Sequence, residues 1–281
     1  MIGNRGSTRS ARVVRYREGD RERIRDTLVV EEPLEIRLSW VDPDGRRATE
    51  PLAVTMRTPG DDFELVAGFL HGEGVVSEAA DVLELTYCRG DHSQEYNTVE
   101  ARLRPGVAFD LERTRRNFYA TSSCGVCGKA SLDAVTTLGC RTLPEGFTVD
   151  PTLLPELPDL LRDRQDAFER TGGLHAAGLF GADGTCLGVR EDVGRHNAVD
   201  KVLGAAFLER RLPASEAVLV VSGRASFELV QKAVMAGVPM LVAVGAPSTL
   251  AVDLARRFGQ TLVGFARDGG CNVYTGEERV A

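Results

Sequence analysis

The sequence contains no long apolar run. None of its stretches reaches the roughly 20 consecutive apolar residues that a membrane-spanning helix needs. The first residues also lack the apolar core of a secretory signal. Both absences argue against membrane and exported proteins, so the sequence predicts a cytoplasmic protein with no membrane partner.

Cysteine is also scarce. The chain has six cysteines, spread too thinly for the disulfide framework of a small secreted protein. They are Cys88, Cys124, Cys127, Cys140, Cys186 and Cys271. Only Cys124 and Cys127 stand at a spacing with a chemical meaning, and we expect the other four to be small, buried hydrophobic residues.

Lysine is nearly absent, and negative charge predominates. The only lysines are Lys129, Lys201 and Lys232, which we interpret as a bias of composition without bearing on function. The net charge of −7 argues against a general nucleic-acid-binding protein.

Residues 1–25 nevertheless hold eight arginines with few apolar partners. This composition predicts a disordered basic arm, which is either a solvated tail or a surface that contacts a partner.

The first half of the chain indicates a small α+β domain over residues 26–118. An apolar content of 43% in 281 residues permits two modest domains. Leu34 to Trp40 and Ala48 to Arg57 flank the turn sequence Asp42-Pro-Asp-Gly45. This pattern predicts a β-hairpin.

A helix is predicted after this hairpin. Asp61 and Glu64 fit an N-terminal capping pattern for a helix that runs through Leu70. Two further strands, over Val82 to Cys88 and Thr98 to Leu103, complete the predicted domain.

Residues 119–150 are predicted to form a cysteine loop, a helix and a linker. The loop reads Cys124-Gly-Val-Cys127, with a small residue on either side of the pair. Two thiols at this spacing can bind one metal, close a disulfide, or let one thiolate carry sulfur while the other assists. A predicted helix over Ala130 to Leu138 would place the loop at a helix N-terminus, which lowers the pKa of a thiol.

Residues 151–281 are predicted to form an α/β domain that binds a cofactor. Its strands are mostly apolar and alternate with helices, which predicts a mixed, largely parallel sheet covered on both faces. A proline-containing linker leads into a predicted helix that ends near Arg170. The other predicted elements are a hairpin over Leu174 to Val189, helices His196 to Arg210, Ser226 to Met235 and Thr249 to Phe258, and strands Ala217 to Val221, Met240 to Val244 and Thr261 to Ala266.

Three loops are expected at the carboxyl ends of the strands, where such sheets bind ligands. They are Ser222 to Ser226, Gly245 to Ser248 and Arg267 to Gly270. Arg224 adds positive charge for a phosphate. Because no Walker or Rossmann fingerprint is present, each loop alone fits an ordinary turn equally well.

His196 lies in a polar stretch between a predicted strand and helix. Beside Asp192 and Arg195, it is a candidate acid, base or ligand contact, with a purely structural role given equal weight. His175 is the weaker candidate.

Several short motifs occur in a specific order. They are Thr58-Pro-Gly-Asp-Asp62 with Gly68-Phe-Leu and Gly72-Glu-Gly, then Ser123-Cys-Gly-Val-Cys-Gly128, Glu191-Asp-Val-Gly-Arg-His-Asn197 and Val221-Ser-Gly-Arg. Together they resemble the FdhD family of formate dehydrogenase accessory sulfurtransferases, from about Leu28 to Tyr274. The CxxC sequence alone would be a weak signal, whereas the ordered set is specific.

The resemblance implies a sulfur transfer. Family members accept persulfide sulfur from a cysteine desulfurase on the CxxC loop. They pass it to the molybdenum of the bis-molybdopterin guanine dinucleotide cofactor before insertion into formate dehydrogenase. Cys124 would bear the persulfide and Cys127 would assist.

The resemblance also implies how this cargo is bound. The cofactor-binding stretch falls on Phe265, Ala266, Arg267, Asp268, Gly269 and Gly270, and Arg224 and His196 would lie beside it. The cofactor would be cargo, with no permanent metal. A C-terminal domain similar to the cytidine deaminase fold and a homodimer are implied as well.

Two other functions stay open on the sequence. His71-Gly-Glu73 upstream of the CxxC is similar to a zinc deaminase signature, although Ser123 stands where that signature has proline and the separation is long. The second open function is a non-enzymatic cofactor chaperone with a structural CxxC. A closed zinc site needs four ligands, and the sequence has no second CxxC to supply the remaining two.

Overall fold

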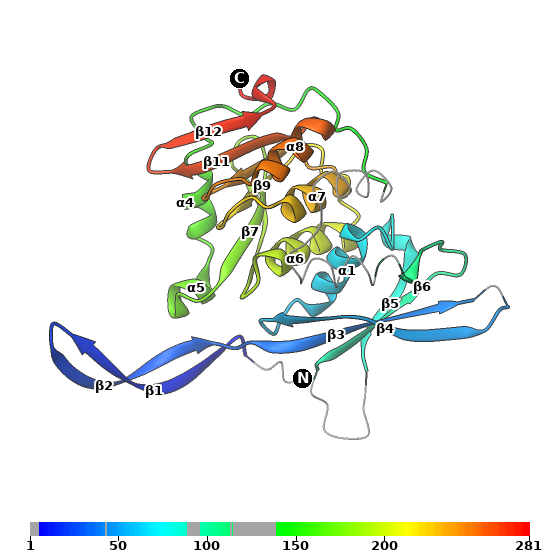
Figure 1. The fold of residues 1–281 in the computed structure, drawn as a ribbon, viewed down its shortest axis with the longest axis horizontal. Helices are drawn as coiled ribbons and strands as arrows, with labels where there is room; N and C mark the ends of the chain where they lie inside the picture. The colour runs from blue at the N-terminus through cyan, green and yellow to red at the C-terminus, as the bar shows by residue number, and fades with distance from the viewer. Residues whose placement is uncertain (1–5, 43, 89–95, 113, 115–138) are drawn as a thin grey trace.

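The computed structural model describes residues 6–42, 44–88, 96–112, 114 and 139–281. They form an N-terminal ribbon, a four-stranded sheet with one helix, and a six-stranded sheet with helices on both faces (Figure 1). No helix in these ranges is long and apolar enough to cross a membrane.

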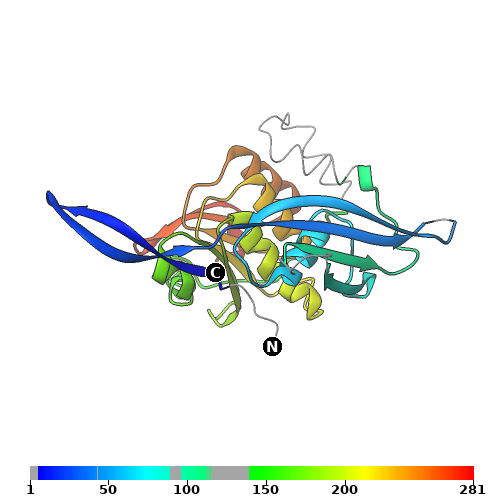
Figure 2. The same ribbon diagram turned by 90° about the horizontal axis from the view of Figure 1, so that it is seen from below.

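The N-terminal ribbon consists of β1 (Thr8–Arg17) and β2 (Asp20–Val29), paired antiparallel along their whole length. It projects from the body (Figure 2). The sequence predicted a disordered arm over residues 1–25, so the ordered ribbon differs from that prediction. The reason is a tight turn at Glu18 and Gly19, both with positive φ, and the cross-strand pair Val13 and Ile24. The dense arginines obscured both signals.

The four-stranded sheet has the order β4-β3-β6-β5. Its strands are β3 (Glu32–Val41), β4 (Arg47–Arg57), β5 (Val82–Tyr87) and β6 (Thr98–Leu103), with a short 3₁₀ turn η1 (Ala79–Asp81) before β5. These strands confirm the predicted hairpin and both later strands. Leu34, Ile36 and Leu38 alternate toward one face and are fully buried under a helix.

That helix, α1 (Asp62–Gly72), confirms the prediction, but the predicted cap is wrong. Asp61 has a φ of 55° and its side chain accepts no capping hydrogen bond. Asp62 instead accepts two hydrogen bonds of 3.0 Å from the Arg57 guanidinium, which is 1% exposed. The helix start is therefore fixed by a buried ion pair with the end of β4.

The six-stranded sheet has the order β12-β11-β10-β9-β7-β8. Its strands are β7 (His175–Phe180), β8 (Cys186–Asp192), β9 (Val218–Val221), β10 (Met240–Ala243), β11 (Thr261–Arg267) and β12 (Gly270–Thr275). The sheet is mixed, as predicted, but parallel pairing is confined to β9, β10 and β11. The hairpins β7–β8 and β11–β12 place antiparallel strands on both sides of this centre, and β12 was not predicted.

Helices cover both faces of this sheet, which confirms the predicted layers. On one face lie α6 (Arg195–Leu208), α7 (Phe227–Met235) and α8 (Thr249–Phe258). The opposite face packs on α4 (Leu157–Arg162), next to α5 (Asp166–Thr171). The sequence predicted one helix ending near Arg170, whereas the structure has two short ones. The C-terminal η2 (Glu277–Arg279) completes the elements.

Alternate residues of the central strands pack against the helices on opposite faces of the sheet. Leu219 and Leu241 pack under α6, α7 and α8, while Val220 and Val242 pack on the α4 side. All four are fully buried. Because both faces are covered, each strand is apolar throughout and is stabilised by about 1.5–3 kcal/mol per buried side chain of this size.

The two sheets are joined through α1 and α6, whose backbones touch. A Cβ atom on Gly68 would lie 1.9 Å from the carbonyl oxygen of Asp200. One on Gly204 would lie 1.8 Å from that of Glu64. Only glycine fits at both positions, so the N-terminal sheet is held firmly against the C-terminal layers.

Candidate functional site

At the carboxyl ends of the parallel strands, the loops after β9 and β10 are bonded to each other and to the end of β11. Gly245 N donates to Gly223 O at 3.0 Å, and Ser248 N donates to Ala225 O at 3.0 Å. Phe265 N donates to Gly245 O at 3.2 Å. We call residues 222–226, 245–248 and 264–265 the carboxyl shelf.

Two glycines let these loops approach closely. A Cβ on Gly245 would lie 3.0 Å from Arg224 Cγ, and one on Gly264 would lie 2.9 Å from Pro247 Cδ. The shelf is therefore a close-packed layer of backbone with the Arg224 side chain exposed. The exposed Arg224 guanidinium suits an anionic, phosphate-bearing ligand.

The predicted cofactor-binding stretch, residues 265–270, lies at the end of β11 and the turn into β12. Phe265 is 37% exposed and Arg267 lies with its guanidinium 6.0 Å from the Phe265 ring. Ala266 is fully buried, so its side chain belongs to the core. Phe265 N binds the shelf directly. The structure therefore brings this stretch and Arg224 to one sheet edge.

His196 lies in the first turn of α6, beside α7. Its Nε2 is 2.7 Å from Glu228 Oε2 and 3.4 Å from Ser226 Oγ. Burial raises the pKa of Glu228, but the hydrogen bond and charge of His196, together with the charges of Lys232 and Arg195, lower that pKa overall. Glu228 is thus a carboxylate that orients the His196 ring. Sequence reasoning missed it, because only the fold places α7 beside α6.

His175 and Arg195 lie at the same edge. A Cβ on Gly223 would be 3.6 Å from His175 Nδ1 and 3.9 Å from Arg195 Cδ. Burial, followed by the charges of Arg195 and His196, lowers the pKa of His175. His175, the weaker candidate from the sequence, therefore lies close to the shelf.

Beneath the shelf, a buried polar junction joins two of the sequence motifs. Asp192 is fully buried, and its Oδ2 lies 2.8 Å from Lys201 Nζ and accepts from Thr58 N at 3.1 Å. Asp192 Oδ1 accepts from Gly194 N at 2.8 Å and from Asn197 Nδ2 at 3.0 Å. These groups satisfy one another, so Asp192 and Asn197 fix the loops rather than face a ligand.

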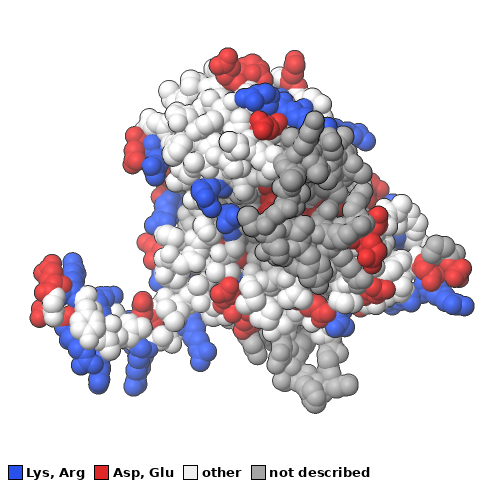
Figure 3. Space-filling model, in the orientation of Figure 1, with Lys and Arg blue, Asp and Glu red and all other residues white. Residues whose placement is uncertain are grey.

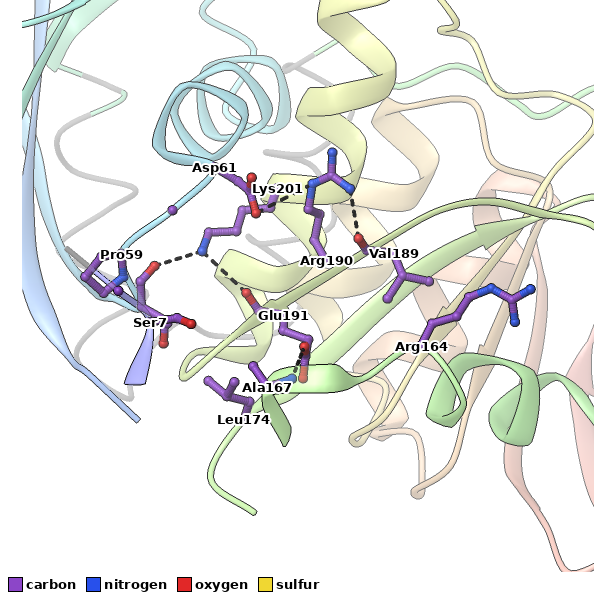
Figure 4. Close-up of a pocket in the computed structure, with 13 residues that line it drawn as sticks. Ser7, Pro59, Asp61, Arg164, Ala167, Leu174, Val189, Arg190, Glu191 and Lys201 are labelled. Carbon is purple, nitrogen blue, oxygen red and sulfur yellow. Dashed lines mark hydrogen bonds and ion pairs between the residues drawn. The ribbon is translucent and has the colours of Figure 1, made fainter. Parts of the chain in front are cut away.

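A pocket of about 540 Å³ lies between this junction, the ribbon base and α5 (Figure 4). Lys201 Nζ donates there to Thr58 O at 2.9 Å. Glu191 accepts from the amides of Ala167 and Phe168 at 2.9 and 2.7 Å. These polar groups of the wall are bonded to other protein groups, so the pocket carries no ligand assignment.

His71 is enclosed at the end of α1. It is 7% exposed, with Nδ1 3.3 Å from Val76 O and Nε2 3.2 Å from Met235 O. Burial lowers its pKa. A backbone carbonyl therefore faces each ring nitrogen, which disfavours His71 as the metal ligand of a deaminase.

Nearby, a second buried pair crosses from α6 to α7. Lys232 Nζ lies 2.7 Å from Asp200 Oδ1. Burial raises the pKa of Asp200 and of Glu73, which lies close to the same lysine. The described residues include no group of three or more His, Cys, Asp and Glu side chains that could hold a metal.

Cys124 and Cys127, with the predicted helix after them, lie outside the described residues. Among the cysteines that the structure does describe, Cys140 is buried as predicted, and burial raises its pKa to about 12. Cys88, Cys186 and Cys271 are half-buried. Burial raises the pKa of Cys88 and of Cys271, which disfavours their thiolates.

The motifs that meet at the shelf and the buried junction also match a known protein family. The model of the FdhD/NarQ family matches residues 29–281. The chain belongs to the FdhD/NarQ family. It is 55% identical over 279 residues to a Streptomyces avermitilis protein named sulfur carrier protein FdhD, covering 98% of this chain and 96% of that protein. A protein of the same name from Mycobacterium tuberculosis is 52% identical, with 98% and 99% covered.

A solved structure shares the fold. It is described as a formate dehydrogenase accessory protein from Desulfotalea psychrophila, and it superposes with a TM-score of 0.74 at 24% identity. The match covers 98% of this chain and all of the other. The chain therefore has the same overall fold as that structure.

Proposed function

We propose that this chain is a sulfur carrier in the maturation of formate dehydrogenase. Relatives at 46–55% identity are named sulfur carrier protein FdhD, and they match 90–98% of the chain. The observation that carries the finer proposal is the carboxyl shelf, where two loops, the end of β11, Arg224 and His196 share one edge. A carrier needs both a thiol and a place to hold the acceptor.

The sulfur would be carried by Cys124 of the CxxC loop. Its thiolate attacks the outer sulfur of a persulfide on a cysteine desulfurase, a new S–S bond forms, and the donor cysteine leaves as a thiolate. Cys127 then displaces the carried sulfur by attacking the Cys124 sulfur. The two cysteines close a disulfide, supply both electrons, and release the sulfur as sulfide. A cellular thiol reductant would reset the pair.

The acceptor would be the molybdenum of a bis-molybdopterin guanine dinucleotide cofactor, held as cargo at the shelf. Its phosphates suit the guanidinium groups of Arg224 and Arg267. A guanine suits the exposed Phe265 ring, because aromatic faces stack on bases. His196, oriented by Glu228, would add a directed hydrogen bond.

This proposal has two protein partners, a desulfurase as donor and formate dehydrogenase as client. The chain would act as a homodimer and as a sulfurtransferase. It would not need a resident metal.

Intact mass after incubation with a cysteine desulfurase and cysteine tests the carrier step. We expect the wild-type chain and Cys140→Ala to gain one sulfur atom that a thiol reductant removes. Cys124→Ala should gain none. Equal loading of Cys124→Ala, or no loading of the wild type, would overturn the assignment.

A cofactor chaperone without transfer is the second candidate, because the shelf alone could hold a nucleotide. Cargo binding separates the two. A transferase with Cys124→Ala still binds the cofactor but leaves the client inactive, whereas a pure chaperone with this change still activates it. About one zinc per chain or per dimer in the purified protein would instead support a structural CxxC.

A further inference from the structure

The N-terminal ribbon stands apart from the rest of the chain. In Figures 1 and 2, β1 and β2 extend away from both sheets. Among the described elements, only α5 makes more than slight contact with it, through β2 at the base. The family model begins at residue 29, so the ribbon precedes the matched region.

The antiparallel register divides the ribbon into two unlike faces, since directly opposed residues share a face. One face pairs Arg15 with Glu22 and Arg17 with Asp20, and is neutral overall. The other is basic and has no acidic residue. Its side chains are Thr8, Ser10, Arg12, Val14, Tyr16, Arg21, Arg23, Arg25, Thr27 and Val29.

This basic face has the character of a binding surface. Tyr16 is 69% exposed and Val14 43% exposed, and arginine and tyrosine are enriched where proteins bind each other. Arg12 lies directly opposite Arg25, an arrangement that repels until an anionic group lies between or over them. A two-stranded ribbon without a cover is only marginally stable in water, so a partner would stabilise it.

The distribution of charge along the chain indicates which kind of partner the basic face would bind. Residues 1–29 hold eight arginines and four acidic residues and therefore carry +4, which leaves −11 on the rest of a chain whose net charge is −7. Figure 3 shows the Lys and Arg side chains along the ribbon and charges of both signs on this face of the body. A second copy of this chain thus offers a large acidic body to the basic ribbon.

The base of the ribbon shows where a second copy would be reached. Two ribbons of ten residues, each about 33 Å long, that lie side by side and antiparallel bring each tip to the other's base. At that base lies α5, which follows α4 in the chain. The exposed acidic residues of these helices and their ends are Glu156, Asp159, Asp163, Asp166 and Glu169.

Nearby arginines of α4 and α5 are engaged within these helices. The Arg162 guanidinium lies 3.9 Å from the Phe168 ring centroid. Arg164 donates to Leu160 O and Arg170 to Asp166 O, at 3.0 and 3.2 Å. These three arginines are themselves exposed, so the surface carries five exposed acidic residues against three arginines and is acidic by two net charges.

We propose that two copies of this chain exchange their ribbons, with the basic face of each lying on the acidic α4–α5 surface of the other. This exchange closes a two-fold dimer in which both ribbons are covered and no open chain of subunits forms. It specifies the interface of the dimer in the proposed function, but it does not depend on sulfur transfer.

Sedimentation equilibrium of the full chain tests the exchange. We expect a dimer whose dissociation constant rises with salt. Arg21→Gln/Arg23→Gln should raise that constant roughly tenfold or more, because both changes fall on the basic face. Arg15→Gln/Arg17→Gln removes the same charge from the neutral face and should change it less than about threefold.

A charge swap makes the test specific for α5. Arg21→Glu/Arg23→Glu should yield monomers, and adding Asp166→Arg/Glu169→Arg to the same chain should restore the dimer. Circular dichroism checks that each variant is folded. A wild-type monomer, equal effects of the two glutamine pairs, or no rescue would overturn the exchange. Persulfide loading of the monomeric variant keeps this failure separate from failure of the carrier function.

Discussion

At the residue scale, Asp192 and Lys201 form the ion pair that links the β4–α1 loop to α6. Both are at most 1% exposed, and their atoms lie 2.8 Å apart. Asp192→Asn would leave the Lys201 charge buried without its partner, so we expect the free energy of unfolding to fall by about 3–5 kcal/mol. Urea denaturation measures it.

The exposed pair of Glu84 and Arg102, 2.8 Å apart, provides the matched control. Glu84→Gln should cost less than about 1 kcal/mol. Equal effects of the two substitutions would mean that Asp192 does not hold the loops together.

Cysteine reactivity separates the CxxC pair from the buried thiol. Since the pKa of Cys140 is raised to about 12, iodoacetamide at about pH 8 should modify Cys124 and Cys127 in the folded chain but not Cys140. A raised pKa also means that stability from Cys140 is full below its ordinary value of 9.0 and is lost as the pH rises toward 12. Mass spectrometry of peptides from the labelled chain identifies which cysteines are modified. Rapid labelling of Cys140 in the folded chain would contradict its burial.

Glu228 contributes through its contact with His196. Its pKa is lowered from 4.5, so this contact stabilises the fold above that value and is lost as the pH falls through the lower folded value. Glu228→Gln should therefore show a shallower loss of stability between about pH 6 and pH 3 than the wild type. Urea midpoints across this range measure it. An unchanged pH profile would show that the contact is absent in solution.

Sequence motifs pointed to several residues that the structure brings together, whereas the contacts of these residues depend on the fold. His196 and Arg224 were predicted as site residues, and the structure places both at the sheet edge. Lys201 and Glu228 were missed, because a charged residue of a helix gains a partner only from the element packed against it. Asp192 was foreseen as part of a polar cluster, yet its burial makes it a support for the loops.

At the element scale, the crossing of α1 and α6 depends on two glycines. Gly204→Ala would place a methyl group 1.8 Å from Glu64 O. The helices would have to separate, and we expect a loss of about 1–3 kcal/mol or more. Thermal unfolding measures this loss.

Gly188→Ala is the control for that substitution, because a Cβ there meets no atom within 4 Å. It should leave the melting temperature nearly unchanged. A stable Gly204→Ala variant would show that the two helices are not in backbone contact.

Most elements of both sheets followed from the sequence, because their apolar residues recur with the period of a strand or helix. Three features did not. The ribbon β1–β2 was hidden by its arginines, β12 by its few apolar residues, and the break between α4 and α5 by a helical pattern that continues across Gln165. In each case, packing or a turn decided the structure rather than periodicity.

At the scale of the whole molecule, the α1–α6 contact, the buried junction and the shelf form one continuous structure. The junction fixes α6, α6 carries His196, and His196 meets α7 beside the shelf loops. A cargo bound at the shelf would therefore be held by a rigid edge. The thiols that the sequence assigns to sulfur transport would need to reach that edge.

Transfer of labelled sulfur in a single turnover tests this account most directly. The wild-type chain is loaded with radioactive sulfur and mixed with the molybdenum cofactor and inactive formate dehydrogenase. We predict that the label leaves the chain, that formate oxidation appears in proportion, and that Arg224→Ala loads normally but transfers poorly. If Cys124→Ala activates the client as well as the wild type does, or if the label never leaves the loaded chain, the chain is not the sulfur carrier proposed.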